Sequence, residues 1–156
     1  CPDLDHPGTE ILHGESFSNG VTAALRRIKY RPTKEVVSDE FPFMLTTGRV
    51  LEHFNAGTMT MRTPNTKLRP TDRLMISKAD SKRLAIANGE SVRLKSAYGE
   101  AILPAEVTAK VKDGELFASF HDPDIFLNYA TGPTRDRFTQ APEFKVTAVA
   151  IEKIKG

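Results

Sequence analysis

The stretch LTTGRVLEHFNAGTMT, residues 45–60, changes character at Gly48. The residues just before this glycine, FMLTT at 43–47, are typical of a buried strand. After it, apolar periodicity stops and hydrogen-bonding side chains take over: Arg49, Glu52, His53, Asn55, Thr58 and Thr60. A polar loop that leaves a buried strand at a glycine is typical of a binding site. We therefore predict that this loop holds a large, polar ligand that carries phosphate.

Composition places the chain among soluble globular proteins. It has 156 residues, of which 39% are hydrophobic, and a mean hydropathy of −0.35, which fits one domain with a core of its own. No apolar run approaches the roughly 20 residues of a membrane span. The chain opens with Cys1, its only cysteine, without a methionine or a signal core. We expect a piece of a longer polypeptide, with no internal disulfide and no cysteine metal site.

Charge is unevenly distributed along the chain. The net charge of +2, from 22 basic and 20 acidic residues, is too small to indicate nucleic-acid binding. Residues 41–73 alone carry five basic and two acidic side chains, a balance of +3. Four of the five basic residues are arginines, whose planar fork suits phosphate and carboxylate. Charge alone favours neither an oxyanion-binding loop nor an ordinary solvated one.

The remaining pattern predicts a mainly β fold. Short strands are expected at 43–47, 73–76, 91–96, 101–107, 107–111, 116–120 and 144–151, with a bend or edge at Pro104. A helix should begin after an N-cap at Ser77 and stop at Asn88-Gly89, and 112–115 should form a tight hairpin. Strands without βα alternation indicate a closed or nearly closed barrel with a peripheral helix. The two long polar loops, 49–72 and 121–143, follow buried strands and are expected to meet at one face.

Motifs for catalysis are absent from the sequence. It contains no GxGxxG, no GxxxxGK[ST] and no HExxH, and its histidines at 6, 13, 53 and 121 lie far apart. His6 and His13 sit in turn-like surroundings, whereas His53 and His121 begin the two long loops. No nucleophile–base pair follows from the spacing. From its residues alone, the chain is therefore a binding module, with no predicted catalytic or metal-ligating residue.

These residues resemble a known family. LTTGRVLEHFNAGTMT is similar to the signature of the molybdopterin dinucleotide-binding domain of the dimethyl sulfoxide reductase superfamily, and formate dehydrogenase alpha subunits match best. The resemblance continues through residues 76–98, Phe120-His121, Asn128, Thr131 and the PEFK at 142–145. Asp5-His6-Pro7-Gly8-Thr9 resembles the linker that precedes the domain. Ser119 departs from the pattern, because the family often has proline there.

The resemblance implies a fold, a cofactor and a set of contacts. The fold is a six-stranded double-psi β-barrel with short peripheral helices, formed by residues 41–156, with 1–40 as a linker from the preceding domain. The cofactor is bis(molybdopterin guanine dinucleotide) with molybdenum or tungsten. The resemblance implies cofactor contacts from Thr47, Gly48, Arg49, Val50, Leu51, His53, Asn55, Thr58, His121, Asn128, Tyr129 and Lys145. It assigns no catalytic residue and no metal ligand to this segment.

The resemblance also implies what lies outside the chain. The complete enzyme would oxidise formate to carbon dioxide, with the metal ligand and a [4Fe-4S] cluster in other domains of the same catalytic subunit. Further partners would be electron-transfer subunits; nucleic acid and membrane are not expected partners of this segment. The segment alone should be inactive, and its expected compartment is the cytoplasm. The alternatives are a nitrate reductase, a formylmethanofuran dehydrogenase, or a double-psi barrel that acts as a binding module without molybdenum.

Overall fold

The computed structural model describes residues 4–5, 7–17, 20 and 25–154. Cys1 and His6 lie outside these residues, as does part of the stretch 21–30, for which the sequence favoured neither strand nor helix. Its described part, 25–30, forms neither. The chain divides into two compact units, Cys1–Pro32 and Thr33–Gly156. In the first unit, the rings of His13 and Phe17 lie 4.8 Å apart, and Phe17 bridges to Gly20.

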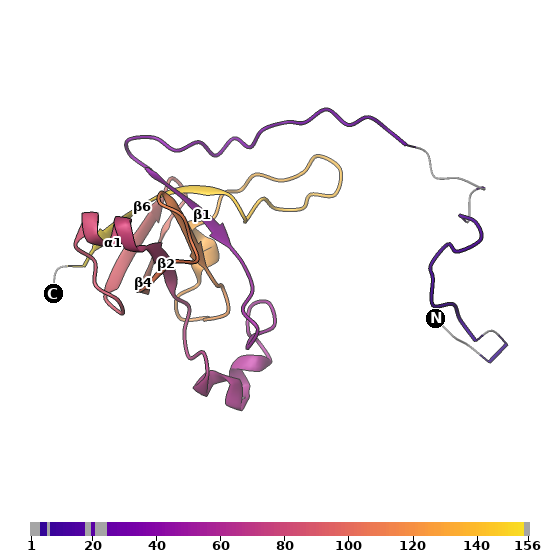
Figure 1. Cartoon of the computed structure of the whole chain (residues 1–156), viewed down its shortest axis with the longest axis horizontal. Helices are drawn as coiled ribbons and strands as arrows, with labels where there is room; N and C mark the ends of the chain where they lie inside the picture. Colours follow the sequence, from indigo (N-terminus) through magenta and orange to yellow (C-terminus); the bar gives the residue numbers. More distant parts are fainter. Residues whose placement is uncertain (1–3, 6, 18–19, 21–24, 155–156) are drawn as a thin grey trace. The chain divides into compact units, whose positions relative to one another are not determined.

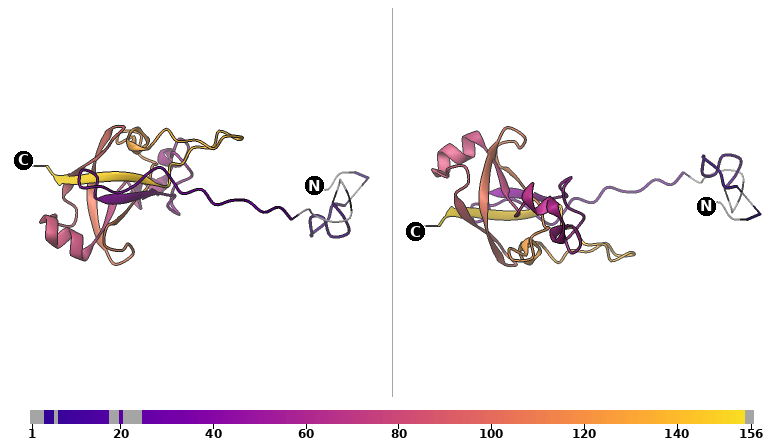
Figure 2. Two further views of the ribbon diagram at one scale, coloured as in Figure 1. Left: turned by 90° about the horizontal axis from the view of Figure 1, so that it is seen from above. Right: turned by 90° about the horizontal axis from the view of Figure 1, so that it is seen from below.

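Six strands of the second unit close into a barrel. They are β1 (Phe43–Thr47), β2 (Leu74–Ser77), β3 (Ser91–Ser96), β4 (Glu100–Thr108), β5 (Glu115–Ala118) and β6 (Thr147–Lys153). Their order around the barrel is β1-β5-β2-β4-β3-β6, and β6 pairs back to β1. Figures 1 and 2 show the barrel in three views. The pairs β1–β5 and β2–β4 are parallel and the other four are antiparallel. The predicted six-stranded closed barrel is thereby confirmed.

The barrel interior is filled by aliphatic side chains from alternate strand positions. In β3, for example, Val92 and Leu94 are fully buried, whereas Arg93 and Lys95 lie on the outer side. Leu45, Leu74 and Ile76 are equally inaccessible. Each such side chain contributes about 1.5–3 kcal/mol through burial. This apolar interior fixes the strand ends, from which the polar loops emerge.

The helix α1 (Lys78–Leu84) begins where the sequence predicts and ends earlier. Ser77 is its N-cap, and the Ser77 hydroxyl accepts a hydrogen bond from the backbone N–H of Asp80. The helix ends at Ala85, which adopts a left-handed conformation with φ 53°, so the predicted stop at Asn88-Gly89 is wrong. The left-handed turn lets Ile86 pack into the core as a loop residue. Figure 1 shows α1 on the outside of the barrel.

Two further expectations are corrected. Pro104 does not interrupt β4, because pairing with β3 reaches residue 104 and pairing with β2 begins only at Ala105. The Ala105 N–H donates to the Glu90 carbonyl oxygen, on the side of β3. Successive N–H groups of a strand point to opposite sides, so the N–H that Pro104 lacks would point toward β2, where pairing has not yet begun. Residues 112–115 form a turn but no hairpin, because β5 pairs with β1 and β2 and not with β4.

The two long loops contain short 3-10 turns: η1 (Thr60–Arg62) and η2 (Pro64–Lys67) in the first, and η3 (Leu127–Ala130) in the second. Among the described residues, no helix combines the length and the apolar character that crossing a membrane requires.

Candidate functional site

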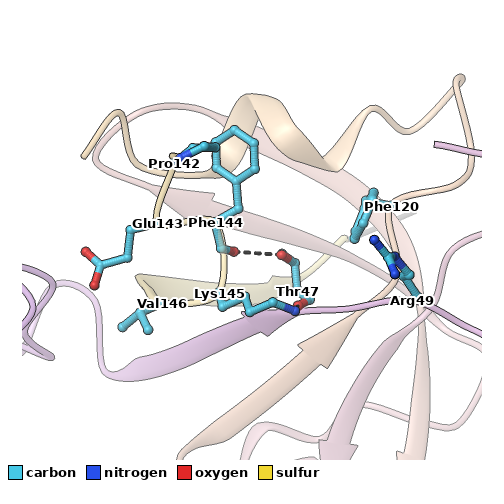
Figure 3. A pocket seen from close by; sticks show the side chains of 8 residues that line it. All are labelled: Thr47, Arg49, Phe120, Pro142, Glu143, Phe144, Lys145 and Val146. Atoms are coloured by element: carbon cyan, nitrogen blue, oxygen red, sulfur yellow. Dashed lines mark hydrogen bonds between the residues drawn. The ribbon is translucent and has the colours of Figure 1, made fainter. Parts of the chain in front are cut away.

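A pocket of about 720 Å³ opens beside the C-terminal end of β1. It is lined by Thr47 at the end of β1, by Arg49 at the start of the first loop, by Phe120 after β5, and by residues 142–146 before β6. Arg49 and Phe120 lie on one side of this large pocket, with Pro142 and Phe144 on the other (Figure 3). Three stretches far apart in sequence therefore meet here, because barrel closure brings the ends of their strands together.

Hydrogen bonds hold the backbone of the large pocket. The Thr47 hydroxyl donates to the carbonyl oxygen of Phe144 at 2.6 Å, as Figure 3 shows. The Lys145 Nζ donates to the Thr47 carbonyl oxygen at 3.4 Å. Arg49 is exposed, and no described residue forms a hydrogen bond or an ion pair with its guanidinium. A guanidinium and an ammonium at one pocket favour an anionic ligand.

A smaller pocket of about 130 Å³ lies where the two long loops meet. Thr58 comes from the first loop and Asn128 from the second, and Phe120 lines both this pocket and the large one. The Asn128 Oδ1 atom is buried and has no hydrogen-bond partner. Asp122, also in the lining, accepts a hydrogen bond from the Thr71 hydroxyl at 2.5 Å. The small pocket is therefore lined by Asn128 and Asp122 among mainly apolar residues, whereas Arg49 and Lys145 line the large pocket.

His53 lies behind the pockets and lines neither. It is buried, with its Nε2 atom 2.8 Å from the Arg69 carbonyl oxygen and its Nδ1 atom 3.0 Å from the Thr60 hydroxyl. A carbonyl oxygen can only accept, so Nε2 carries a proton and donates it to Arg69, while the Thr60 hydroxyl can either donate to Nδ1 or accept from it. Both nitrogens of His53 are thus occupied by protein groups.

The ring of His121 stacks on that of His53, with centroids 4.1 Å apart and planes 13° from parallel. Asp72, which is fully buried, accepts the backbone N–H groups of His121 and Asp122 at 3.0 and 3.1 Å. The His121 Nδ1 atom also lies 2.7 Å from an Asp72 oxygen, but the two groups are not aligned for a hydrogen bond. His53, His121 and Asp72, which we call the histidine cluster, therefore join the two loops.

Burial decides the protonation of His121. Removal from water lowers the pKa of its imidazole below the ordinary value of 6.5, and the charges of His53 and Arg69 lower the pKa further. The carboxylates of Asp72 and Asp122 act in the opposite direction without reversing the shift. His121 is therefore neutral at pH 7. The histidine cluster connects the two loops in this arrangement, and neither imidazole lines any of the pockets described for residues 47–146.

The other predicted contact residues are scattered. Val50 and Leu51 line a third pocket of about 460 Å³, which also includes Arg49. Asn55 is exposed with a left-handed φ of 50°, and Tyr129 is exposed beside the ring of Phe126. None of these four lines the large or the small pocket.

Gly48 has a packing role of its own. A Cβ atom at this position would lie 2.4 Å from the ring of Phe117, so the glycine makes room for that ring. Its N–H donates to Ala118 at 3.0 Å and continues the pairing of β1 with β5. The side of Gly48 that lacks a side chain therefore faces protein.

Sequence reasoning missed several lining residues. Phe120, Phe144 and Glu143 line the large pocket, and Asp122 lines the small one, yet none was among the predicted contacts. Phe120 and the 142–145 stretch already carried the family resemblance, which was a signal for the first three. Asp122 follows directly after His121 and had no separate signal.

Comparison with known proteins agrees with this architecture. The family described as "Molydopterin dinucleotide binding domain" matches residues 43–148. The chain is 37% identical over 157 residues to the F420-dependent formate dehydrogenase subunit alpha of Methanocaldococcus jannaschii, a match that covers 99% of this chain and 23% of that protein. It is 29% identical to the periplasmic nitrate reductase of Desulfovibrio desulfuricans, with 98% and 22% covered.

A solved structure shows the same fold. Acetylene hydratase from Pelobacter acetylenicus superposes with a TM-score of 0.64 at 12% identity, over 74% of this chain and 19% of that one. The chain thus spans about a quarter of the length of the relatives it matches. The family match covers β1 to β5 and both walls of the large pocket, and it ends at Ala148 within β6. The chain belongs to the molybdopterin dinucleotide-binding domain family.

Proposed function

We propose that this chain is the C-terminal cofactor-binding domain of a molybdenum or tungsten oxidoreductase and that it holds a bis(molybdopterin guanine dinucleotide) cofactor. The observation that carries the proposal is the pair of pockets that share Phe120 in their linings, one with Arg49 and Lys145 and the other with Asn128 and Asp122. The cofactor has the matching parts, since its pyrophosphates are anionic and its guanine and pterin rings carry N–H donors.

The residues present fit such a ligand. Asn128 places a buried acceptor without a partner at the small pocket, and an N–H of a guanine or pterin edge would satisfy it. The Arg49 guanidinium, which no described residue engages, would donate to phosphate oxygens at the large pocket. Lys145 would add a second positive charge there. Thr58 would contribute a hydroxyl on the side of the first loop.

When bound, the cofactor supplies the two-electron redox chemistry, and this chain orients and screens it. Arg49 and Lys145 offset the phosphate charge, so the site needs no metal ligand of its own. Thr47 holds the 142–146 wall through the Phe144 carbonyl group. The histidine cluster keeps the two loops together behind the small pocket. None of these residues exchanges a proton with a substrate in this proposal, which is why the isolated chain should be inactive.

The complete enzyme is proposed to oxidise formate to carbon dioxide. The support is the similarity to relatives named formate dehydrogenase subunit alpha, at 32–37% identity over 99% of this chain. The metal ligand and a [4Fe-4S] cluster would come from other domains of the same subunit, with electron-transfer subunits as partners and the cytoplasm as compartment. A nitrate reductase is the second candidate, because two relatives at 29% and 31% identity carry that name.

Analysis of the cofactor in the longer protein tests the central proposal. Purified enzyme should contain molybdenum or tungsten, and release guanine nucleotide and pterin on denaturation. Formate should reduce an acceptor dye with that enzyme, and the purified 156-residue chain should give no turnover. Nitrate-dependent oxidation of a reduced dye, without formate activity, would favour the second candidate. An enzyme without either metal or pterin would refute the proposal.

A titration with GDP tests the site in the chain itself, because GDP carries the guanine and the phosphates of the cofactor. We expect Arg49→Gln and Asn128→Ala to weaken binding. Arg62→Gln is the matched control, since Arg62 is an exposed arginine of the same loop that lines none of the three pockets. Equal losses from Arg49→Gln and Arg62→Gln would mean that only net charge matters and that the large pocket is not the site.

A further inference from the structure

A short segment ahead of the barrel is fastened to one wall of the large pocket. The Thr33 hydroxyl donates to the Glu143 carboxylate at 3.0 Å, and the Glu35 carboxylate accepts the backbone N–H of Ala148 at 3.0 Å. These two hydrogen bonds bracket residues 143–148, which contain most of the wall. We call residues 33–35 the strap. In Figure 3 the Glu143 side chain points away from Arg49 and Phe120, so its carboxylate serves the strap and leaves the cationic side of the pocket unopposed.

Glu35 is unusual for a residue of a connecting segment, because it is only 8% exposed and has no cationic partner among the described residues. Its other oxygen accepts the Tyr98 hydroxyl at 2.5 Å. This hydrogen bond to the carboxylate, with burial and the nearby negative charge, raises the pKa of the Tyr98 phenol. A buried carboxylate is tolerated only when donors satisfy it, and here two donors come from different parts of the barrel.

The strap is internally stiff and reaches the second loop as well. The Thr33 hydroxyl accepts the Glu35 backbone N–H at 3.1 Å while it donates to Glu143, so that one oxygen sets both residues. At Gly132, a Cβ atom would lie 3.1 Å from a Glu35 oxygen, which places the second loop against the same carboxylate. Within the wall, the Thr47–Phe144 hydrogen bond then fixes the middle, and the strap fixes the two ends.

We propose that Thr33 and Glu35 are positioning residues for the large pocket, and that the cofactor-binding unit therefore begins at Thr33, ahead of the 43–148 region that defines the family. This inference rests on the proposed function for the identity of the ligand. Its structural half is independent, since the strap orders the 143–148 wall with or without a ligand.

Hydrogen exchange tests the structural half. In Glu35→Ala, the amides of 143–148 should exchange about tenfold faster, the effect of losing one charge-assisted hydrogen bond, while amides in β2 and β4 keep their protection. Glu35→Gln should restore most of the protection, because its amide oxygen can accept from Ala148 and its NH2 group can donate to the Tyr98 oxygen. Glu40→Ala is the matched control, as Glu40 is exposed in the same connecting segment. Unchanged exchange at 143–148 in Glu35→Ala would overturn the inference.

The phenol absorbance of Tyr98 reports the contact directly. Both Glu35 variants should lower the pKa of Tyr98 relative to the wild type, because the carboxylate that raises it is gone. If Glu35→Ala does not fold, two other variants replace it in the exchange experiment. Thr33→Val removes the hydrogen bond to Glu143, and Tyr98→Phe removes the hydrogen bond to Glu35. For Thr33→Val, the amide exchange of Glu143 and its neighbours is measured.

GDP binding separates the two proposals. We expect the wild type to bind and Glu35→Ala to bind about fivefold to tenfold more weakly. Wild-type binding together with unchanged binding by Glu35→Ala would overturn the positioning role, even if exchange increases. If the wild type does not bind GDP, the proposed function fails, while the exchange result still decides whether the strap orders the wall.

Discussion

Arg49 and His53 lie four residues apart on one polar loop, yet the structure gives them opposite surroundings. Arg49 is exposed at the large pocket, and no described residue engages its guanidinium. His53 is buried, with both ring nitrogens bonded to protein and its face against His121. The difference teaches that hydrogen-bonding side chains of this loop divide between those that no described residue engages and those that hold the loop. Four predictions test this division.

The largest effect should come from the histidine cluster. Asp72→Ala leaves the buried N–H groups of His121 and Asp122 without their acceptor. The free energy of unfolding should fall by about 3 kcal/mol, since each unsatisfied buried group costs about 1–3 kcal/mol. Urea unfolding measures this loss, with the exposed Asp39→Ala as the control. A loss no greater than that of Asp39→Ala would remove the distinction between the two kinds of residue.

Gly48 stands between the two kinds, because its contact with the ligand stays a prediction while the ring of Phe117 packs against it. Gly48→Ala should lower the free energy of unfolding by about 1–3 kcal/mol, since the new methyl group overlaps that ring. In a Phe117→Ala background, the same change should cost much less. A double-mutant cycle by urea unfolding measures the coupling. Additive losses would show that the Phe117 ring is not the obstacle.

Arg49 should behave in the opposite way from Asp72. Arg49→Gln should weaken GDP binding about tenfold, which corresponds to about 1.4 kcal/mol, and should change the free energy of unfolding by less than about 0.5 kcal/mol. Isothermal titration and urea unfolding of the same sample give both numbers. A large loss of stability with unchanged affinity would place Arg49 with His53 as a structural residue.

The smallest effect concerns pH. Because the folded state lowers the pKa of His121 below 6.5, the unfolded chain binds this proton more readily, and stability is lost as pH falls below about 6.5. The free energy of unfolding should therefore be smaller at pH 5.5 than at pH 7.5, as urea unfolding at the two pH values measures. His121→Phe keeps an aromatic ring against His53 and removes the titration, so its loss over the same range should be smaller. Equal pH dependence in both proteins would contradict the assignment.

Local signals sufficed for much of the barrel. The apolar run before Gly48 predicted β1, alternating residues predicted β3, and the N-cap at Ser77 predicted the start of α1, because each signal depends on residues close in sequence. The predicted bend or edge at Pro104 was wrong, since the effect of this proline depends on where pairing with β2 begins. The predicted hairpin at 112–115 was also wrong, because β5 pairs with β1 and β2, which lie elsewhere in the chain.

For the candidate site, sequence and resemblance named Thr47, Arg49 and Lys145, which line the large pocket. Cofactor contacts by His53 and His121 stay predictions. The burial and stacking of these two rings could not be predicted, because burial of a loop residue depends on contacts that span the chain. Glu35 had no signal at all: its hydrogen bond to Ala148 joins residues 113 positions apart. Such contacts exist only once the barrel has closed.

The closure of the barrel by β6 also has a consequence for the order of events during folding. β6 pairs with β1 and with β3, and the wall of the large pocket directly precedes it in the chain. Until β6 docks, β1 and β3 each present an unpaired edge, which is a hazard for aggregation. This last pairing joins the most distant parts of the domain and is therefore expected to be slow. A ligand that needs both walls of the pocket can bind only chains in which β6 has docked. Ligand binding therefore distinguishes completely folded chains from incompletely folded ones.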